Sequence, residues 1–437
     1  MKRSIISEPS SLKGQIKIPG DKSVSHRALI CGALASSPTK ISNLQRSEDV
    51  LNTFKVIKNL GIEAEQKELT IRLFGKGLRG LSKPSNELYF GNSGTGIRLM
   101  TGALSGQNFD SILQGDSSLT KRPMKRISEP LEEMGASINL SSEFTPPIEI
   151  IGNKNLSAIS YDMPIPSAQV KSAILFAALF SEGITKVRES LVSRNHTEFM
   201  FQQFGINLKM VDSEITLSGQ EEFEGKDINV PGDFSSAAFL IVGALITPDS
   251  SVLIKDVGLN STRIALLEVL NSMEADIKIE NLRKFGSEEV GDLRVSSSQL
   301  KSCKVEASLI PNLIDELPIL FIASLFATGD SEFFGVEELR HKESDRLLAM
   351  QSGLKNIEIE TIYNSGKLTI EGKGSDYLID SGTVDSFEDH RIAMAFIIAG
   401  LRSKKNLVVK NTDCIKTSFP EFSYLIDSLG AKINEIQ

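Results

Sequence analysis

Two short stretches in the C-terminal half place carboxylates beside cations, a pattern that could serve proton transfer and anion binding. Residues 342–346 (KESDR) set Glu343 between Lys342 and Arg346, and residues 385–391 (DSFEDHR) precede an apolar helix. A carboxyl near cations can exchange protons, and arginine binds carboxylate or phosphate in a bidentate manner. Taken alone, each stretch also fits an exposed, salt-bridged helix, so both interpretations stay open at this point.

A further acid lies in residues 313–320 (LIDELPIL), where Asp315 occupies a turn into an apolar helix. A carboxylate entering a buried helix is costly unless it is paired or has a role. We therefore select Asp315 as a candidate catalytic acid or base. Its neighbour Glu316 is the less favoured participant.

The N-terminal half contains a candidate anion-binding turn. Residues 87–99 are predicted to form a strand, a glycine-rich turn (GNSGTG, 91–96) and a helix, which would present free N–H groups to an anion. The turn lacks the ending of a Walker loop and the GxGxxG of a dinucleotide fold, which disfavours ATP and NAD. Residues 115–124 add adjacent cations before another helix. The four histidines lack metal-site spacing, and no HExxH or Ser-His-Asp signature occurs.

The elements that position these residues are repeated. Residues 16–23 (IKIPGDKS) return 212 positions later as residues 228–235 (INVPGDFS). Each copy predicts a strand stopped by Pro-Gly and an Asp that caps the following helix. Polar and basic residues distinguish the first copy: Lys22, Ser23, His26 and Arg27. Two related halves are therefore predicted. Only the first copy of the turn carries cations that could take part in chemistry, and the second copy lacks them.

A finer repeat consists of an apolar helix that ends in a turn and leads into a strand. It begins at Leu60, Met134, Phe204, Met273, Leu354 and Leu429. These six joints are about 70 to 80 residues apart, which predicts three units in each half.

Composition limits the class of protein. A chain of 437 residues that is 40% hydrophobic fits two globular domains. Three cysteines without paired spacing favour a reducing compartment, and no apolar run reaches membrane-spanning length, so we expect a cytoplasmic protein without membrane contact. A formal charge of −8 disfavours nucleic-acid binding.

The Pro-Gly-Asp pair also predicts the domain boundaries. We expect one domain to comprise residues 1–18 and 235–437, with residues 19–234 as an inserted domain and a hinge near 19–21 and 231–235. Small molecules often bind between domains, so we expect the substrate there.

Six stretches taken together match one known family. They are residues 18–28 (IPGDKSVSHRA), 91–96 (GNSGTG), 119–124 (LTKRPM), 166–173 (PSAQVKSA), 342–346 (KESDR) and 389–391 (DHR). In this order they closely resemble the EPSP synthases, the 3-phosphoshikimate 1-carboxyvinyltransferases, and the resemblance covers the whole chain. It implies an α/β fold in which two domains, each of three βαβαββ repeats, form an inside-out α/β barrel. This agrees with the repeat count obtained from the joints.

The resemblance implies transfer of the enolpyruvyl group of phosphoenolpyruvate to the 5-hydroxyl of shikimate 3-phosphate, with release of phosphate. No metal or organic cofactor is expected. The expected partners are these two small-molecule substrates, and the protein is expected to be a monomer. The implied ligands of shikimate 3-phosphate are Lys22, Ser23, Arg27, Ser167, Ala168, Gln169, Arg194, Asp315 and Lys342. The implied ligands of phosphoenolpyruvate are Lys22, Gly94, Arg122, Gln169, Arg346 and Arg391. Clustered cations in an acidic protein would attract and align both anions.

Three residues match the family's catalytic positions. We assign Asp315 to the 5-hydroxyl proton, Glu343 to proton transfer at the enolpyruvyl carbon, and Lys22 to assisting Glu343. Two features depart from other members. Thr417 stands where many have a lysine near the C-terminus, with Lys416 one place earlier. Residues 167–169 (SAQ) match the class II subgroup, which often tolerates glyphosate through alanine at the position of Gly94, yet here the glycine is kept.

Two alternatives remain at this stage. UDP-N-acetylglucosamine enolpyruvyl transferases share the fold and reaction type, but carry a reactive cysteine where this chain has Ser117. The second alternative is a catalytically silent module that binds phosphorylated metabolites or RNA ends. Retention of Asp315 and Glu343 disfavours it. Phosphate release from the two substrates discriminates among the three.

Overall fold

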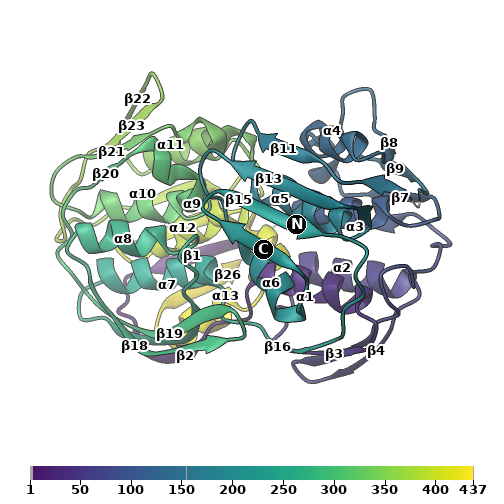
Figure 1. Ribbon diagram of the computed structural model, residues 1–437. Helices are drawn as coiled ribbons and strands as arrows, with labels where there is room; N and C mark the ends of the chain where they lie inside the picture. Colours follow the sequence, from purple (N-terminus) through teal and green to yellow (C-terminus); the bar gives the residue numbers. More distant parts are fainter. Residues whose placement is uncertain (1–2, 154, 437) are drawn as a thin grey trace. The chain divides into compact units, whose positions relative to one another are not determined.

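The structure is a computed structural model that describes residues 3–153 and 155–436 (Figure 1). By its internal contacts the chain divides into two compact units. Unit 1 contains the described residues up to Pro19, then Gly232–Arg283 and the chain from Glu289 onward; unit 2 contains Gly20–Pro231 and Lys284–Glu288. Each unit has its own hydrophobic core.

Each unit contains three four-stranded sheets. In unit 2 their strand orders are β16-β3-β5-β4, β6-β7-β9-β8 and β11-β13-β15-β14. These strands are β3 (Pro38–Ser42), β4 (Glu63–Lys67), β5 (Thr70–Phe74), β6 (Leu88–Tyr89), β7 (Ser111–Gln114), β8 (Ser137–Asn139), β9 (Ile148–Ile151), β11 (Ser160–Met163), β13 (Ile184–Glu189), β14 (Leu208–Val211), β15 (Glu214–Ser218) and β16 (Asp227–Asn229). A separate two-stranded sheet joins β10 (Leu156–Ser157) to β12 (Ser181–Glu182).

Unit 1 repeats the arrangement with the orders β18-β19-β17-β2, β20-β21-β23-β22 and β24-β25-β1-β26. Its strands are β1 (Ser4–Glu8), β2 (Lys13–Lys17), β17 (Ser251–Gly258), β18 (Asp276–Phe285), β19 (Glu288–Ser296), β20 (Lys304–Val305), β21 (Ser331–Phe334), β22 (Thr361–Asn364), β23 (Lys367–Ile370), β24 (Gly382–Asp385), β25 (Leu407–Lys410) and β26 (Lys432–Ile436). In all six sheets one end pair of strands is parallel and the adjoining pair is antiparallel. This shared pattern is what three copies of one βαβαββ unit per half produce.

Six apolar helices, three in each unit, are almost wholly buried. They are α1 (Lys22–Leu34), α3 (Gly94–Ser105), α5 (Ala168–Ala178), α7 (Phe234–Ile246), α10 (Leu317–Leu325) and α12 (His390–Gly400). In unit 2, α3 contacts α1 and α5, whereas α7, α10 and α12 contact one another in unit 1. A helix that is apolar on all sides belongs in a core, so each unit has helices inside and sheets outside.

The second helix of each repeat is amphipathic or only partly buried. These helices are α2 (Glu48–Asn59), α4 (Lys125–Glu133), α6 (His196–Phe204), α8 (Ala265–Ser272), α11 (Arg346–Asn356) and α13 (Phe422–Ser428), and a short α9 (Ile310–Leu313) precedes α10. All six joints predicted from the sequence occur at the ends of these helices. At the third joint Gly205 has φ +76°, in the left-handed region that favours glycine, and at the fourth Glu274 adopts φ +65° instead.

At each of the two Pro-Gly-Asp turns the chain passes from one unit to the other. Strand β2 pairs with β17 in unit 1, but the next helix, α1, belongs to unit 2; strand β16 pairs with β3 in unit 2, and α7 belongs to unit 1. The turns hydrogen-bond reciprocally, because Asp21 N donates to Pro231 O at 2.7 Å and Asp233 N donates to Pro19 O at 2.9 Å.

One segment departs from the boundaries expected from the sequence. Lys284–Glu288, at the turn between β18 and β19, belongs to unit 2 although the rest of both strands belongs to unit 1. Glu288 is buried and its Oε1 lies 2.6 Å from Nδ1 of His196. At Gly286 a β-carbon would lie 2.3 Å from Cδ of Gln203, so the backbone approaches α6 closely. No periodic pattern in the sequence predicts that this segment belongs to unit 2, since its placement depends on long-range side-chain contacts.

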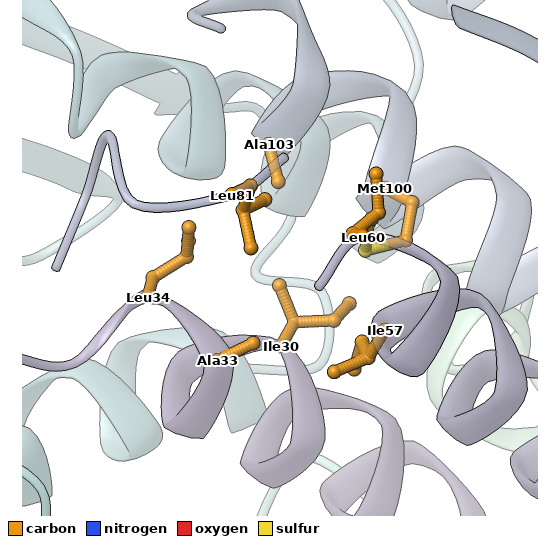
Figure 2. Close-up of a pocket in the computed structure, with 8 residues that line it drawn as sticks. All are labelled: Ile30, Ala33, Leu34, Ile57, Leu60, Leu81, Met100 and Ala103. Carbon is orange, nitrogen blue, oxygen red and sulfur yellow. The ribbon is translucent and has the colours of Figure 1, made fainter. Parts of the chain in front are cut away.

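A small void lies in the core of unit 2 and is lined only by apolar side chains (Figure 2). It is too narrow to admit water. The lining residues are Ile30, Ala33, Leu34, Ile57, Leu60, Leu81, Met100 and Ala103. Without a polar group to orient an anion, this void is a packing feature and not a substrate site.

Within the described chain, no single helix is long and apolar enough to span a membrane. One pair of helical segments, Ala307–Leu313 and Leu317–Leu325, is long and apolar enough when the two are taken together, but they are bent by 113° to each other.

Candidate active site

Most of the residues singled out from the sequence lie at the N-terminal ends of the six buried helices. Side chains cap five of these ends: Asp21, Ser93, Ser167, Asp233 and Asp389 accept hydrogen bonds from the first turns of α1, α3, α5, α7 and α12. The N-terminus of a helix carries a partial positive charge and unpaired N–H groups, which favour anions. The repeated fold thus produces several anion-favouring ends in each unit.

On α1 of unit 2, Lys22 remains partly accessible. Its Nζ lies 3.1 Å from Oδ2 of Asp49, and 16% of its side chain is exposed. Ser23 is half-buried beside it. Lys22 therefore keeps a position from which its ammonium group can reach a ligand.

Arg27 lies one turn further along α1, and its side chain is buried. Its Nε donates to Thr197 Oγ1 at 2.6 Å, its Nη2 to Ser172 Oγ at 2.8 Å and its Nη1 to Ser23 O at 2.8 Å. Burial lowers the pKa of Arg27 to about 10, against the opposing effect of the Glu198 carboxylate, so the group is charged at neutral pH. Arg27 consequently ties α1 to α5 and α6.

His26, which the sequence places beside these cations, is fully buried. Its Nδ1 lies 2.9 Å from Thr53 Oγ1, and its Nε2 lies 3.3 Å from Ser93 Oγ. Burial, with the charge of Lys22 as the next cause, lowers the pKa of His26 to about 3. His26 is therefore neutral at pH 7 and holds the serine that caps α3.

The glycine-rich turn brings two arginines to the start of α3. A β-carbon on Gly94 would lie 2.8 Å from Nη1 of Arg122 and 2.9 Å from Nη1 of Arg98. Arg98 also donates to Gln169 Oε1 at 2.7 Å, and Gln169 donates to Thr95 Oγ1 at 3.0 Å. The expected residues Gly94, Arg122 and Gln169 thus lie close together at the start of α3. Sequence reasoning missed Arg98, although a cation four residues after Gly94 on a predicted helix was a usable signal.

Ser167, Ala168 and Gln169 begin α5, where Ser167 Oγ accepts from Val170 N at 3.4 Å. Arg194 lies in the connection between β13 and α6 and is half-buried. The expected ligands in unit 2 therefore come from the starts of α1, α3 and α5 and from two connections that precede outer helices.

In unit 1, three arginines surround Asp315. Its carboxylate oxygens lie 3.3 Å from Nη1 of Arg346, 3.7 Å from Nε of Arg391 and 3.8 Å from Nη1 of Arg263. Asp315 keeps 20% of its side chain exposed. It is thus a carboxylate at the start of α10 that is strongly stabilised by positive charge yet accessible to a small molecule.

A second carboxylate, fully buried, follows Asp315 in the chain. Glu316 is completely buried, accepts a hydrogen bond from Ser235 Oγ, and lies 3.9 Å from Nη2 of Arg263 and 3.9 Å from Nη1 of Arg391. Ser235 belongs to the second Pro-Gly-Asp copy, which was predicted to have no role in the site. The copy carries no cation of its own, but the Ser235 hydroxyl hydrogen-bonds to Glu316. No motif in the sequence pointed to Arg263.

Arg346 is the centre of the cluster in unit 1. Its Nε donates to Asp389 Oδ2 at 2.8 Å, its Nη1 to Asp315 Oδ1 at 3.3 Å and its Nη2 to Glu343 Oε2. Burial by itself would lower the pKa of Arg346, but the carboxylates, led by Asp389, outweigh it and raise that pKa. The salt-bridged helix interpretation of residues 342–346 is therefore wrong for Arg346, because its guanidinium is fully buried.

Lys342 and Arg391 complete this group. Burial lowers the pKa of Lys342, and the nearby Asp315 carboxylate opposes that change. Arg391 donates from Nη1 to Asp315 O at 2.8 Å. Lys416, in contrast, is exposed and pairs with Asp413 at 3.6 Å, and Thr417 donates to Cys414 O at 2.7 Å.

Among residues 3–153 and 155–436, no cluster of three histidine, cysteine, aspartate or glutamate side chains has the geometry of a metal site. The chemistry of the described groups is that of carboxylates and cations.

Comparisons with known proteins identify the family. A sequence model described as EPSP synthase (3-phosphoshikimate 1-carboxyvinyltransferase) matches residues 6–425. The 3-phosphoshikimate 1-carboxyvinyltransferase of Legionella pneumophila (strain Lens) is 45% identical over 435 residues, 99% of each chain. That of Geobacter sulfurreducens is 41% identical over 431 residues, 98% of this chain and 100% of the other. Solved EPSP synthase from Acinetobacter baumannii superposes with a TM-score of 0.90 at 41% identity, covering all of both chains.

These matches confirm the predicted mixed α/β fold, an inside-out α/β barrel in two parts, and the family resemblance found in the motifs. The chain belongs to the EPSP synthase family.

Proposed function

We propose that this protein transfers the enolpyruvyl group of phosphoenolpyruvate to the 5-hydroxyl of shikimate 3-phosphate and releases phosphate. Family membership over the full chain supports the reaction. The observation that carries the proposal is the grouping of Asp315 and Glu343 around Arg346, since the reaction needs a base and an acid near cations that hold anionic substrates.

The proposed steps balance as follows. Asp315 accepts the proton of the 5-hydroxyl, whose oxygen attacks the enol carbon of phosphoenolpyruvate, while the carboxyl of Glu343 protonates the methylene carbon to a methyl group. In the tetrahedral intermediate the Glu343 carboxylate takes a proton back from that methyl group, the carbon–oxygen bond to phosphate breaks, and phosphate leaves with the proton that Asp315 took from the hydroxyl. Lys22 assists the transfer at carbon and neutralises developing charge.

We assign the substrate ligands residue by residue. Shikimate 3-phosphate would be held by Lys22, Ser23, Arg27, Ser167, Ala168, Gln169, Arg194, Asp315 and Lys342. Phosphoenolpyruvate would be held by Lys22, Gly94, Arg122, Gln169, Arg346 and Arg391. The helix starts and arginines described above support these assignments, and Arg98 joins them through Gln169.

Arg346 can bind phosphoenolpyruvate only if one of its carboxylate partners gives way, because its side chain has no exposed surface. Glu343 is the most exposed of the three at 24%, against 20% for Asp315 and none for Asp389. We therefore expect the substrate anion to replace Glu343 on Arg346. The same exchange would release Glu343 for proton transfer.

The proposed ligands divide between the two units, so neither unit holds a complete set. We propose that the Pro-Gly-Asp turns near residues 19–21 and 231–235 act as a hinge when shikimate 3-phosphate binds. We also propose a cytoplasmic monomer, which the three free cysteines support, since thiols persist in reducing compartments. Sedimentation analysis of the purified chain checks the oligomeric state.

The direct test measures phosphate release from phosphoenolpyruvate with shikimate 3-phosphate, with each substrate omitted in turn. Asp315→Asn should lower kcat roughly 10²–10⁴-fold, the usual contribution of a positioned acid or base. Replacing shikimate 3-phosphate by UDP-N-acetylglucosamine should give no phosphate. Binding of both substrates without turnover would instead support a silent binding module.

A further inference from the structure

Lys171 is a charged residue in the interior of unit 2 that the proposed reaction does not use. It lies on α5, two residues after Gln169, and its side chain is fully buried. Its Nζ lies 2.7 Å from Glu189 Oε2 and 2.7 Å from Glu198 Oε1, and both glutamates are also buried. Three buried charges are costly, so the arrangement persists only where the geometry satisfies them.

The two glutamates come from the elements on either side of the connection that carries Arg194. Glu189 is the last residue of β13, and Glu198 lies in the first turn of α6. Lys171 therefore joins the start of α5 to both ends of the Ser190–Asn195 connection. Ser190, Leu191 and Val192 are exposed, and Ser193 is the first buried residue of that connection.

Ser193, immediately before Arg194, is fixed by this ion cluster. Lys171 Nζ donates to Ser193 O at 3.3 Å, Ser193 N donates to Glu189 Oε2 at 3.4 Å, and the Ser193 hydroxyl donates to Glu189 Oε1. The backbone N–H, carbonyl and side chain of one residue are thus all tied to Lys171 or Glu189. The position of Arg194 follows from that of Ser193.

The same cluster supports Arg27. Thr197 and Ser172, which accept from Arg27, each adjoin a member of the cluster, since Thr197 precedes Glu198 and Ser172 follows Lys171. Among the charges that oppose the lowering of the Arg27 pKa by burial, Glu198 is the largest. The two arginines expected to hold shikimate 3-phosphate in unit 2 therefore depend on one buried group of side chains.

We propose that Lys171, with Glu189 and Ser193, is a positioning residue that sets Arg194 for binding shikimate 3-phosphate. The inference rests on the proposed function, because the substrate and the role of Arg194 come from it. Lys171 touches no substrate. It holds the α5 start and the Arg194 connection in one geometry, and a displacement of about 1 Å in a positioning element is enough to lower affinity or rate substantially.

Lys171→Met is the direct variant, but it leaves two carboxylates facing each other in the interior and can unfold unit 2. Ser193→Ala and Glu189→Gln are therefore the main tests. Ser193→Ala removes one donor while the ion pairs remain, and Glu189→Gln leaves Lys171 with Glu198. Ser181→Ala is the matched control, because Ser181 is an equally buried serine in the same unit that donates to Ala178 O.

The experiment measures the dissociation constant of shikimate 3-phosphate by calorimetry, together with kcat and both KM values. Ser193→Ala and Glu189→Gln should each weaken shikimate 3-phosphate binding about tenfold. The KM for phosphoenolpyruvate should stay within threefold in both variants, and the thermal midpoint of Ser193→Ala should remain close to that of Ser181→Ala. A purely structural role would change both substrates and stability together.

A double-mutant cycle tests whether Ser193 affects binding through Arg194. If Ser193 acts through Arg194, Ser193→Ala should weaken binding tenfold in the wild type but have no further effect on Arg194→Ala. Equal losses in both backgrounds, or unchanged binding in Ser193→Ala and Glu189→Gln, would overturn the inference while the enzyme still turns over. Absence of turnover in the wild type would overturn the proposed function itself, so the two failures are distinguishable.

Discussion

Arg346 donates from Nε to Oδ2 of Asp389 at 2.8 Å, and neither side chain has any exposed surface. The other carboxylate oxygen, Oδ1, accepts from Arg391 N at 2.9 Å and so caps α12. One carboxylate thus begins the helix that carries Arg391 and also neutralises the arginine at the centre of the cluster. Helix formation and assembly of the site are coupled at this residue.

Asp389→Asn should keep the cap, since asparagine is a good N-cap residue, but leave the buried charge of Arg346 less compensated. Breaking a buried ion pair from one side typically costs about 3–5 kcal/mol, so the variant should unfold at clearly lower urea concentration and lose activity. Asp380→Asn, at an exposed pair with Lys404, is the control and should behave like the wild type. Wild-type stability in Asp389→Asn would mean that Asp315 and Glu343 compensate Arg346 without it.

Glu343→Gln separates chemistry from binding. Glutamine keeps the shape of the side chain and removes only its capacity to exchange a proton, so kcat should fall roughly 10²–10⁴-fold while shikimate 3-phosphate affinity stays within a few-fold. Turnover and calorimetric titration of the purified variant measure both. Glu337→Gln changes an exposed carboxylate in the preceding turn and should have no effect. Near-normal turnover in Glu343→Gln would move the proton-transfer role to Lys22.

Gly94→Ala tests the space beside the proposed phosphoenolpyruvate ligands. A methyl group there would lie within 3 Å of a terminal nitrogen of both Arg98 and Arg122, so these side chains must shift. We expect glyphosate to compete with phosphoenolpyruvate in the wild type and to inhibit Gly94→Ala more weakly. Inhibition constants from initial rates decide this. Equal resistance of both proteins would show that sensitivity is controlled elsewhere.

Shikimate 3-phosphate should reduce the radius of gyration in small-angle scattering, because its proposed ligands belong to both units. Arg194→Ala with Lys342→Ala, which removes one ligand from each unit, is the control and should abolish the change at the same ligand concentration. A profile that is identical with and without ligand at saturation would contradict closure at the Pro-Gly-Asp turns.

His26 should make the protein sensitive to mild acid. Its pKa is about 3 in the folded state, below the usual 6.5, so the unfolded state binds the extra proton as the pH falls below 6.5. Its contribution to stability is therefore complete above that pH and is lost progressively toward pH 3. Between pH 7 and 5 the loss is about 2 kcal/mol.

The measurement compares urea unfolding of the wild type and His26→Asn at pH 7 and pH 5 by circular dichroism. The variant should be less stable at pH 7, because the buried hydrogen bonds to Thr53 and Ser93 are disturbed, but should lose less on acidification. The same acid-induced loss in both proteins would assign the effect to other groups.

Local sequence patterns were sufficient to predict the repeat and the fold class, and they selected most of the residues proposed for the site. The six helix-to-strand joints and the two Pro-Gly-Asp turns are local signals, because a left-handed turn, a capping aspartate and an apolar helix each depend on a few adjacent residues. The cations and carboxylates of the motifs were recognisable for the same reason, since each motif lies at the start of one helix.

Which charges contact one another could not be predicted from local sequence, because it depends on the packing of distant segments. Arg346 contacts Asp315 and Asp389, which are 31 and 43 residues away, and Lys171 lies between Glu189 and Glu198. Arg263 and Glu316 became part of the site only through such long-range contacts. Burial changes a charged side chain from a solvated surface group into one that must be paired, and burial is a property of the packed chain that local sequence does not contain.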